Sequence, residues 1–285
     1  MPNIYNSSMI GGVTENYYRQ VEKLRLSESR ALLKNKFEEY EDLVFIYIPT
    51  YNRSEYLLKR SIPSVLSQTH QNFLCLIVGD GCDDDTQEVI RGFNDPRLVY
   101  LGLPFRSHRF PDSQENRWFA GPIFPANVAL QSVPLHAKWI ARIDDDEIWM
   151  RNHLEDSIQY AKKFDFEFVT SGAVASYATK PAIEHMGDRI ESSYFYPGTT
   201  ENTSSPLIGT TSTIVYRSYL CNFLYNPECW RKKHNRVNDI DLYVRFFESG
   251  VRMGHTGLVT VNSIPREGSE DNLGIKAYLI KNEMP

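Results

Sequence analysis

The chain of 285 residues lacks the features that mark membrane and secreted proteins. It has no apolar run near the roughly 20 residues that span a bilayer. Its polar start, residues 1–18, does not have the basic-then-apolar pattern of a secretory signal. The four cysteines form no CxxC pair, which favours reduced thiols and disfavours a zinc site. These absences predict a cytoplasmic protein.

The chain also lacks the motifs of several large enzyme classes. No GxxxxGKS/T loop is present, and no GxGxxG follows the first apolar run, which disfavours kinases, motor ATPases and ordinary NAD enzymes. The absence of GxSxG disfavours an α/β-hydrolase. Basic residues number 31 against 36 acidic ones, a net charge of −5, so the chain has no positive surplus for binding nucleic acid.

What is present is the composition and element order of an α/β domain. Hydrophobic residues make up 41% of the chain and aromatic residues 13%, enough for a sizeable core. Apolar runs predict buried strands at residues 43–48, 73–78, 98–103 and 138–143. Helical patterns predict a helix after Ser54 that Pro63 kinks or splits, and further helices near residues 84–93, 121–132 and 154–161. This alternation predicts a parallel sheet with helices on both faces.

The two ends of the chain differ from this regular part. Residues 14–40 have helical spacing, and we expect residues 1–42 to form a helical extension that covers the core rather than docking a partner or membrane. Residues 43–285 then form a single domain. Its first half, 43–150, has the pattern of a nucleotide-binding unit. In its second half, 151–285, strands near 166–177, 212–216 and 258–264 and a helix near 238–249 are separated by long loops, as in an acceptor-binding unit.

Acidic residues follow two of the predicted strands, at the sheet edge where α/β proteins bind ligands. Asp80 directly follows one strand and could accept hydrogen bonds from a base or ribose, although an Asp there is often only a turn residue. Four adjacent carboxylates, residues 144–147, follow another strand. Such a group repels itself unless a hard cation such as Mg²⁺ or Mn²⁺ binds it. The alternative is a solvated acidic turn.

A third acidic group, residues 238–241, opens a predicted helix. Asp239 is there either a helix cap or a base held ionised and aimed into a cleft. Three candidates are weaker. The basic run at residues 231–236 could contact an anionic acceptor or membrane headgroups, and His255 or Arg266 could reach a diphosphate. The acceptor pocket could be lined by Gly209, Thr210 and Thr211.

Four segments, in order, resemble the inverting glycosyltransferases of family 2, which have the GT-A fold. They are VFIYIPTYNR (residues 44–53), LIVGDGCDDDT (76–86), WIARIDDDEIWMRNHLE (139–155) and VNDIDLYVRFFESG (237–250). Each motif alone is modest, but together they cover residues 43–265 in the order of the family. The resemblance implies an α/β fold of the GT-A type, with a mostly parallel central sheet flanked by helices.

The resemblance also implies roles for particular residues. Those that would bind the nucleotide sugar are Pro49, Thr50, Tyr51, Asn52, Asp80, Asp144 and Asp145. Asp146 would be the direct ligand of Mn²⁺ or Mg²⁺, with Asp144 as the other member of the D-x-D motif. Asp239 would be the general base.

The implied function is metal-dependent, inverting transfer of a sugar from a nucleotide-diphosphate donor, a UDP-sugar favoured, to an acceptor hydroxyl. The acceptor would be a glycan or a lipid-linked sugar in surface polysaccharide synthesis, which allows peripheral association with the inner face of the membrane. One alternative is a sugar-phosphate nucleotidyltransferase, disfavoured because PTYNRSEY stands where its Gly- and Lys-rich loop would be. The other is a non-catalytic nucleotide-sugar-binding module.

The chain departs from the family pattern at three places. Residues 125–127 read PAN where an arginine is common, Gly79 replaces an Asp before Asp80, and Asn238 replaces a Glu before Asp239. The insert at residues 104–120 is long for this position, and we expect an ordered cap over the site, with Arg106, Arg109 or Arg117 reaching donor or acceptor.

Overall fold

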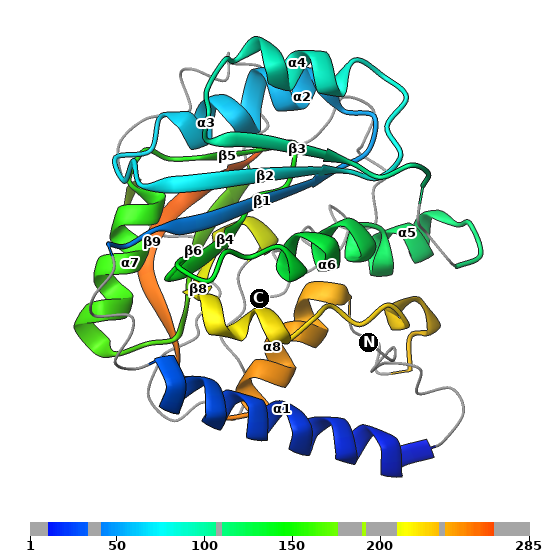
Figure 1. Cartoon of the computed structure of the whole chain (residues 1–285), viewed down its shortest axis with the longest axis vertical. Helices are drawn as coiled ribbons and strands as arrows, with labels where there is room; N and C mark the ends of the chain where they lie inside the picture. Colours follow the sequence, from blue (N-terminus) through cyan, green and yellow to red (C-terminus); the bar gives the residue numbers. More distant parts are fainter. Residues whose placement is uncertain are drawn as a thin grey trace, which may run out of the picture.

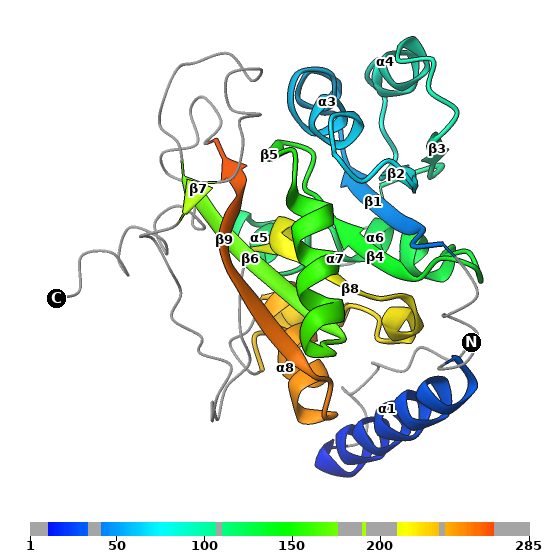
Figure 2. The same ribbon diagram turned by 90° about the vertical axis from the view of Figure 1, so that its left-hand side faces the viewer.

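The computed structural model describes residues 11–33, 41–106, 110–175, 190–191, 210–233 and 237–264. In this part of the chain the strands form one mixed sheet with helices on both faces (Figures 1 and 2). The strand order is β3-β2-β1-β4-β8-β6-β9-β5, and β7 also pairs with β9. No described helix is long and apolar enough to cross a membrane.

The first part of the sheet is parallel, as the alternation of strands and helices predicts. It consists of β1 (Val44–Thr50), β2 (Phe73–Gly79), β3 (Leu98–Gly102) and β4 (Trp139–Arg142). β1 lies in the middle and pairs with β2 on one side and with β4 on the other, both in parallel. The carboxyl ends of these strands therefore meet at one edge.

The second part of the sheet is mostly antiparallel, which the sequence does not predict. Its strands are β5 (Glu147–Trp149), β6 (Phe168–Ala175), β7 (Ile190–Glu191), β8 (Ile214–Arg217) and β9 (Met253–Ser263). β8 pairs antiparallel with both β4 and β6, and β5 pairs antiparallel with β9, whereas β6 and β9 are parallel. β8 thus joins the two parts, because it extends the sheet directly from β4.

Alternating side chains of each strand point to opposite faces and enter two separate cores. Val44, Ile46 and Ile48 pack against η1 (Leu57–Ser61), α3 (Ile62–Leu66), α4 (Thr86–Gly92) and α7 (His153–Phe164). Phe45 and Tyr47 pack on the other face against α6 (Ile123–Gln131), α8 (Asn238–Glu248) and Leu26 of α1 (Gly11–Leu33). The sheet is therefore covered on both faces, as predicted.

The helix predicted after Ser54 is modified at its proline. It begins as α2 (Ser54–Tyr56), widens into the π-helical turn η1 and continues as α3, in which Pro63 stands in the first turn. Proline has no N–H to donate in the helical ladder, and a π turn before it accommodates that loss. Ser54 is not the cap: Asp84 accepts its backbone N–H at 3.1 Å and also binds the Thr86 N–H.

Other differences are shorter elements that have weak sequence signals. The insert at 104–120 contains a helix, α5 (Gln114–Ala120), capped by Ser113, whose hydroxyl accepts the Asn116 N–H at 3.1 Å. Short 3-10 turns flank β8, namely η3 (Thr211–Thr213) and η4 (Ser218–Asn222), and η5 (Cys229–Arg231) follows. All four cysteines are free thiols, as expected.

The N-terminal helix α1 is one continuous helix that covers the face of α8 and η4. Arg30 forms an ion pair with Glu167, which Tyr219 also contacts through its hydroxyl at 2.6 Å. Glu22 pairs with Arg245 of α8 at 2.7 Å. These contacts favour the expected role of α1 as a cover of the core. The rest of the predicted extension, residues 1–10 and 34–40, lies outside the described residues.

Candidate active site

The candidate site lies where the carboxyl ends of β1, β2 and β4 meet. β1 ends at Thr50, whose carbonyl accepts the backbone N–H of Asp80 at 2.8 Å. Asp144, Asp145 and Asp146 follow β4 on the other side of β1. In open α/β sheets, ligands bind at such an edge, between strands whose connections leave in opposite directions.

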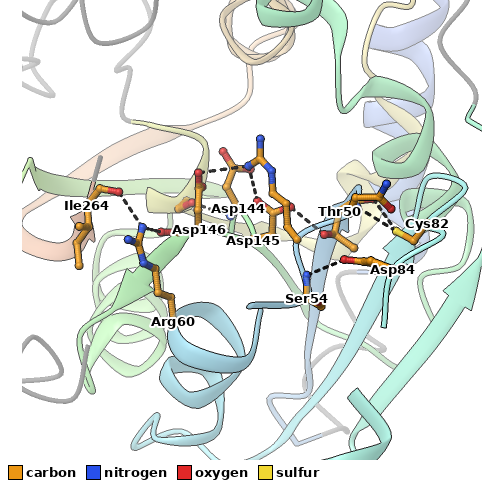
Figure 3. A network of polar contacts seen from close by, with 12 residues as sticks. Thr50, Ser54, Arg60, Cys82, Asp84, Asp144, Asp145, Asp146 and Ile264 are labelled. Carbon is orange, nitrogen blue, oxygen red and sulfur yellow. Dashed lines mark hydrogen bonds and ion pairs between the residues drawn. The ribbon is translucent and has the colours of Figure 1, made fainter. Parts of the chain in front are cut away.

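The middle carboxylate of this group is tied to β1 and to the turn after it. Thr50 donates its hydroxyl to Asp145 Oδ2 at 2.8 Å, and Arg53 Nη1 donates to Asp145 Oδ1 at 2.8 Å. The same Nη1 lies 3.3 Å from Asp146 Oδ2. Figure 3 shows the three aspartates together, with Thr50 on one side and Arg60 on the other. Arg60 fixes the main chain here by donating to the Asp146 carbonyl at 3.1 Å.

The other two aspartates are more exposed than Asp145. The side chain of Asp145 is 6% exposed, against 14% for Asp146 and 35% for Asp144. Asp144 accepts a hydrogen bond from Arg142 Nη2 at 3.0 Å, and its backbone N–H donates to Ser212 Oγ at 2.9 Å. The two members of the predicted D-x-D motif are therefore the ones accessible to a ligand.

Burial controls the ionisation of the acidic group. It raises the pKa of Asp145 to about 6, although the nearby Arg53 opposes this shift. Burial and the negative charge of Asp144 raise the pKa of Glu147 to about 8. Glu147 accepts a hydrogen bond from Ser263 at 2.8 Å, while its Oε2 is buried without a partner among the described residues. Glu147 is thus neutral near pH 7 in the isolated protein.

Within the described residues, no three His, Cys, Asp or Glu side chains form a complete metal site. Mg²⁺, however, is often held by one or two carboxylates, with water and substrate phosphates as the remaining ligands. Asp144 and Asp146 supply such a partial set, since both are accessible oxygen donors at the strand end. The residues present therefore fit a divalent cation whose coordination a diphosphate completes.

Asp239 reaches the same region from α8, where it occupies the first turn. Its Oδ2 accepts the Thr211 hydroxyl at 3.1 Å, and its Oδ1 accepts the Ile240 N–H at 2.9 Å. Burial raises the pKa of Asp239, and the positive charge of Arg142 partly opposes this effect. Asp239 thus accepts one N–H of the first turn of α8, whose N-cap is Val237, and it is also a carboxylate with raised proton affinity.

Two adjacent residues of η3 connect Asp239 with the group after β4. Thr211 binds Asp239, and the next residue, Ser212, binds the main chain of Asp144. Trp149 Nε1 donates to the Ser212 carbonyl at 2.7 Å and so holds the turn against β5. The structure therefore brings the predicted base and the predicted metal-binding motif to two adjacent residues of one short turn.

The residues predicted to border the nucleotide lie in and after β1. Pro49 is in β1 and pairs with Val78, and Asn52 has a positive φ of 49° in the turn that follows. Asn52 accepts the Asp83 N–H at 3.0 Å, which links this turn to the one after β2. The ring of Tyr51 lies under the Arg106 guanidinium, with 3.8 Å between Cζ and the ring centroid.

Each of the three departures from the family pattern has a local structural reason. At Gly79 an added Cβ would lie 2.3 Å from Tyr100 Oη, so a larger residue there requires the Tyr100 ring to move. Asn238 donates through Nδ2 to the Phe119 carbonyl at 3.1 Å, a bond that a carboxylate could not donate. Ala126, which stands where the family has an arginine, is fully buried in the apolar core, where a charged side chain would be costly.

Several weaker candidates have other roles. Arg231 pairs with Glu228, and Lys232 with Glu115 of α5, so these two cations of the basic run are already neutralised. Burial lowers the pKa of His255 to about 4, which leaves it uncharged at neutral pH and unsuited to a diphosphate. Of the arginines of the insert, Arg106 lies at Tyr51 and Arg117 pairs with Asp112. Arg109, Arg266 and residues 234–236 lie outside the described residues.

Four site residues were missed in the sequence: Arg53, Arg60, Arg142 and Ser212. Arg53 belongs to the PTYNR motif, and Thr211 was considered as a pocket residue, but its neighbour Ser212 was not. Arg142 had a clear signal, because a charged residue inside the buried strand WIARI needs a partner.

Comparison with solved structures identifies the fold. TarS of S. aureus, solved with UDP-GlcNAc, superposes with a TM-score of 0.57 and 17% identity, over 79% of this chain and 59% of that one. The mannosyltransferase PcManGT from Pyrobaculum calidifontis, solved with GDP-Man and Mn²⁺, gives 0.54 and 13% identity, over 93% and 76%. The fold is the GT-A fold of glycosyltransferases, as the motifs predicted.

Sequence comparison also supports the predicted family. The family described as "Glycosyl transferase family 2" matches residues 45–109. The UDP-Glc:alpha-D-GlcNAc-diphosphoundecaprenol beta-1,3-glucosyltransferase WfgD of Escherichia coli is 32% identical over 127 residues, which cover 45% of this chain and 44% of that protein. These matches confirm the predicted resemblance to glycosyltransferase family 2. The matched parts span 21% and 44% of the first two curated relatives, less than half of their length.

Proposed function

We propose that the protein transfers a sugar from a nucleotide-diphosphate donor to an acceptor hydroxyl, with a divalent cation and with inversion at the anomeric carbon. The observation that carries this proposal is the turn at η3, which holds Asp239 through Thr211 and the Asp144 main chain through Ser212. A donor diphosphate at Asp144 and Asp146 would then lie close to the carboxylate that removes the acceptor proton. The proposed cation ligands and the proposed base would thus lie in one site, as sugar transfer requires.

The donor side consists of the half-domain 43–150. We propose that Pro49, Thr50, Tyr51 and Asn52 border the base and ribose, and that Asp80 accepts hydrogen bonds from the base. Asp145, held by Thr50 and Arg53, would lie beside the nucleotide sugar. When bound, Mn²⁺ or Mg²⁺ supplies charge neutralisation at the leaving diphosphate. Asp144 and Asp146 would hold it.

The acceptor side consists of the half-domain 151–285, which carries Asp239 on α8. In the proposed reaction, Asp239 takes the acceptor proton as that oxygen attacks the anomeric carbon. Its raised pKa suits this task, because a base with higher proton affinity accepts the proton more readily. A single base opposite the leaving group favours one displacement and hence inversion, by analogy with the geometry of inverting glycosidases.

Names of relatives guide the choice of substrates. The E. coli relative carries in its name a UDP-Glc donor and a diphosphoundecaprenol-linked acceptor, and the TarS structure contains UDP-GlcNAc. We therefore favour a UDP-sugar donor and a glycan or lipid-linked acceptor in polysaccharide synthesis. If the acceptor is lipid-linked, the protein would act at the cytoplasmic face of a membrane.

The first experiment separates an enzyme from a binding module. Thermal shift with UDP, GDP and their sugars, each with Mn²⁺, identifies the donor base, since a bound ligand raises the melting temperature. Turnover is then measured with that donor and lipid-diphosphate-linked sugars, and the anomeric configuration of the product is read by NMR. Binding without turnover over a broad acceptor panel would favour the module, and a retained configuration would exclude the single displacement.

A further inference from the structure

Arg142 is a buried cation between the two functional groups of the site. It is the last residue of β4, and its side chain is 2% exposed. Its Nη2 donates to Asp144 Oδ1 at 3.0 Å, whereas its Nε and Nη1 have no hydrogen-bond partner in the described part of the chain. A buried guanidinium is costly unless nearby negative charge or hydrogen bonds compensate it. Its position therefore requires an explanation.

Aromatic side chains surround this cation. The Arg142 Cζ lies 5.1 Å from the centroid of the Tyr225 ring, and the Tyr225 hydroxyl is 2.9 Å from that of Tyr47. Tyr216 and Tyr243 are buried in the same cluster. A cation over an aromatic ring gains some stabilisation. In such poorly hydrated surroundings, a charge also acts on other charges over longer distances than it does in water.

The second carboxylate near Arg142 is Asp239, because Thr211 binds Asp239 while the next residue, Ser212, binds the main chain of Asp144, to which Arg142 is bonded. Four ionisable groups interact with Asp239: Arg142 from β4 and Asp144 after it act on its charge, and Asp239 acts on Tyr243 of α8 and on Cys229 of η5. Arg142 is the cation among these four. It lowers the pKa of Asp239, while burial and the charge of Asp144 raise it.

We propose that Arg142 is a positioning residue that keeps Asp144 and Asp239 jointly in place, through a hydrogen bond to the first and its positive charge on the second. This rests on the proposed function of the site. Without this cation, the buried carboxylate of Asp239 and the partly exposed carboxylate of Asp144 would repel each other without a compensating positive charge. Arg142 does not need to touch donor or acceptor to have this effect.

The alternative is a purely structural arginine that only fills the tyrosine cluster. The two roles differ in what each substitution should change. Arg142→Gln removes the charge, whereas Arg142→Lys keeps the charge but is too short and too narrow to reproduce the guanidinium fork. Arg217 is the matched control, since it is a partly buried arginine of the same sheet, stacked on Trp139 at 3.9 Å, at the other end of β4.

The experiment measures kcat/KM against pH with Mn²⁺ at saturation, the melting temperature, and the Asp239 pKa by ¹³C NMR titration of labelled protein. For Arg142→Gln we expect kcat/KM to fall about tenfold or more. We also expect the Asp239 pKa, and with it the midpoint on the acidic side of the pH profile of kcat/KM (the acid limb), to rise by roughly one unit. For Arg142→Lys the acid limb and the Asp239 pKa should both stay near their wild-type values, while kcat/KM falls because the bond to Asp144 is lost. Arg217→Gln should leave the limb and the pKa unchanged.

An unchanged Asp239 pKa in folded Arg142→Gln overturns the inference, whether or not the wild type turns over. If the Gln variant does not fold, Arg142→Lys decides, and wild-type kcat/KM in it at every pH overturns the inference as well. A wild type that transfers no sugar while the NMR shift occurs would instead refute the proposed function and leave the charge coupling established.

Discussion

Asp239 and Asp241 are two residues apart on α8, yet they lie in different environments. A step of two residues turns a side chain by about 200° around a helix, so the two carboxylates face opposite sides. Asp239 faces η3 and Arg142, and it keeps a raised pKa. Asp241 faces away, where it accepts the Arg245 Nε–H at 2.9 Å within a buried ion network.

The partners on each side explain what each carboxylate can do. Arg245 bonds to Asp241, to Glu22 of α1 at 2.7 Å and to the Leu224 carbonyl at 2.6 Å, so its donors are used inside the protein. Among the described residues, Asp239 accepts hydrogen bonds from a hydroxyl and an N–H, and no cation is bonded to it, which leaves it able to take a proton. The same residue type thus serves stability on one side of the helix and chemistry on the other.

The largest expected effect that tests this contrast is that of Asp239→Asn. Asn keeps the shape of the side chain, and its amide oxygen can still accept the Ile240 N–H at the start of α8, but it cannot accept a proton. We expect kcat to fall roughly 10²–10⁴-fold, the usual contribution of a general base. The melting temperature and UDP binding should change little, as measured by calorimetry. Near-wild-type turnover would remove Asp239 from the proposed mechanism.

Next in size is Asp146→Ala, which tests the donor side rather than the acceptor side. It removes one of the two accessible carboxylates that would hold the cation between protein and diphosphate. We expect UDP affinity in Mn²⁺ to fall roughly 10–100-fold, the range seen when support of a metal site is lost. EDTA should have the same effect on the wild type and little further effect on the variant. Wild-type affinity that is indifferent to EDTA would contradict the metal assignment.

Asp241→Asn should show the opposite pattern to Asp239→Asn. It removes the charge that faces Arg245, and breaking a buried pair by removing one partner costs about 3–5 kcal/mol in typical cases. Glu22 and the Leu224 carbonyl still bind Arg245, so we expect a smaller loss, measured as a lower urea midpoint with kcat unchanged. An inactive but stable Asp241→Asn would exchange the roles of the two residues.

The smallest expected effect concerns Glu147, a third carboxylate in yet another environment. Its pKa in the folded protein is about 8, above that of an unfolded Glu, so the folded state holds this proton more tightly. The resulting stability is complete below about pH 4 and is lost as the pH rises through 8. In EDTA, Glu147→Gln should therefore weaken the fall in melting temperature between pH 6 and 9. An unchanged slope would show that Glu147 does not titrate there.

The regular part of the fold was predictable from the sequence because its signals are local. The strands β1, β2, β3 and β4 were each predicted within two residues of their observed ends, from short apolar runs. The direction of β8 could not be predicted, since antiparallel pairing with both β4 and β6 depends on contacts between distant residues. The short β5 was missed because it begins at Glu147, the last residue of the acidic group.

The site was predictable as far as its motifs extend. The aspartates after β4 and Asp239 were identified by their places in the motifs, and the structure brings both to η3. The residues that hold them were harder to find. Ser212 and Arg53 act through hydrogen bonds formed between separate elements, which leave no periodic pattern in a sequence.

The close packing of Gly79 against Tyr100 limits how this chain can change. Relatives with an aspartate at the position of Gly79 need room that Tyr100 Oη fills here, 2.3 Å from where a Cβ would be. Introducing the family aspartate alone would force Tyr100 out of place, and shortening Tyr100 alone would open a gap beside β2. The effect of an aspartate at position 79 therefore depends on which residue stands at position 100, so the two positions are coupled.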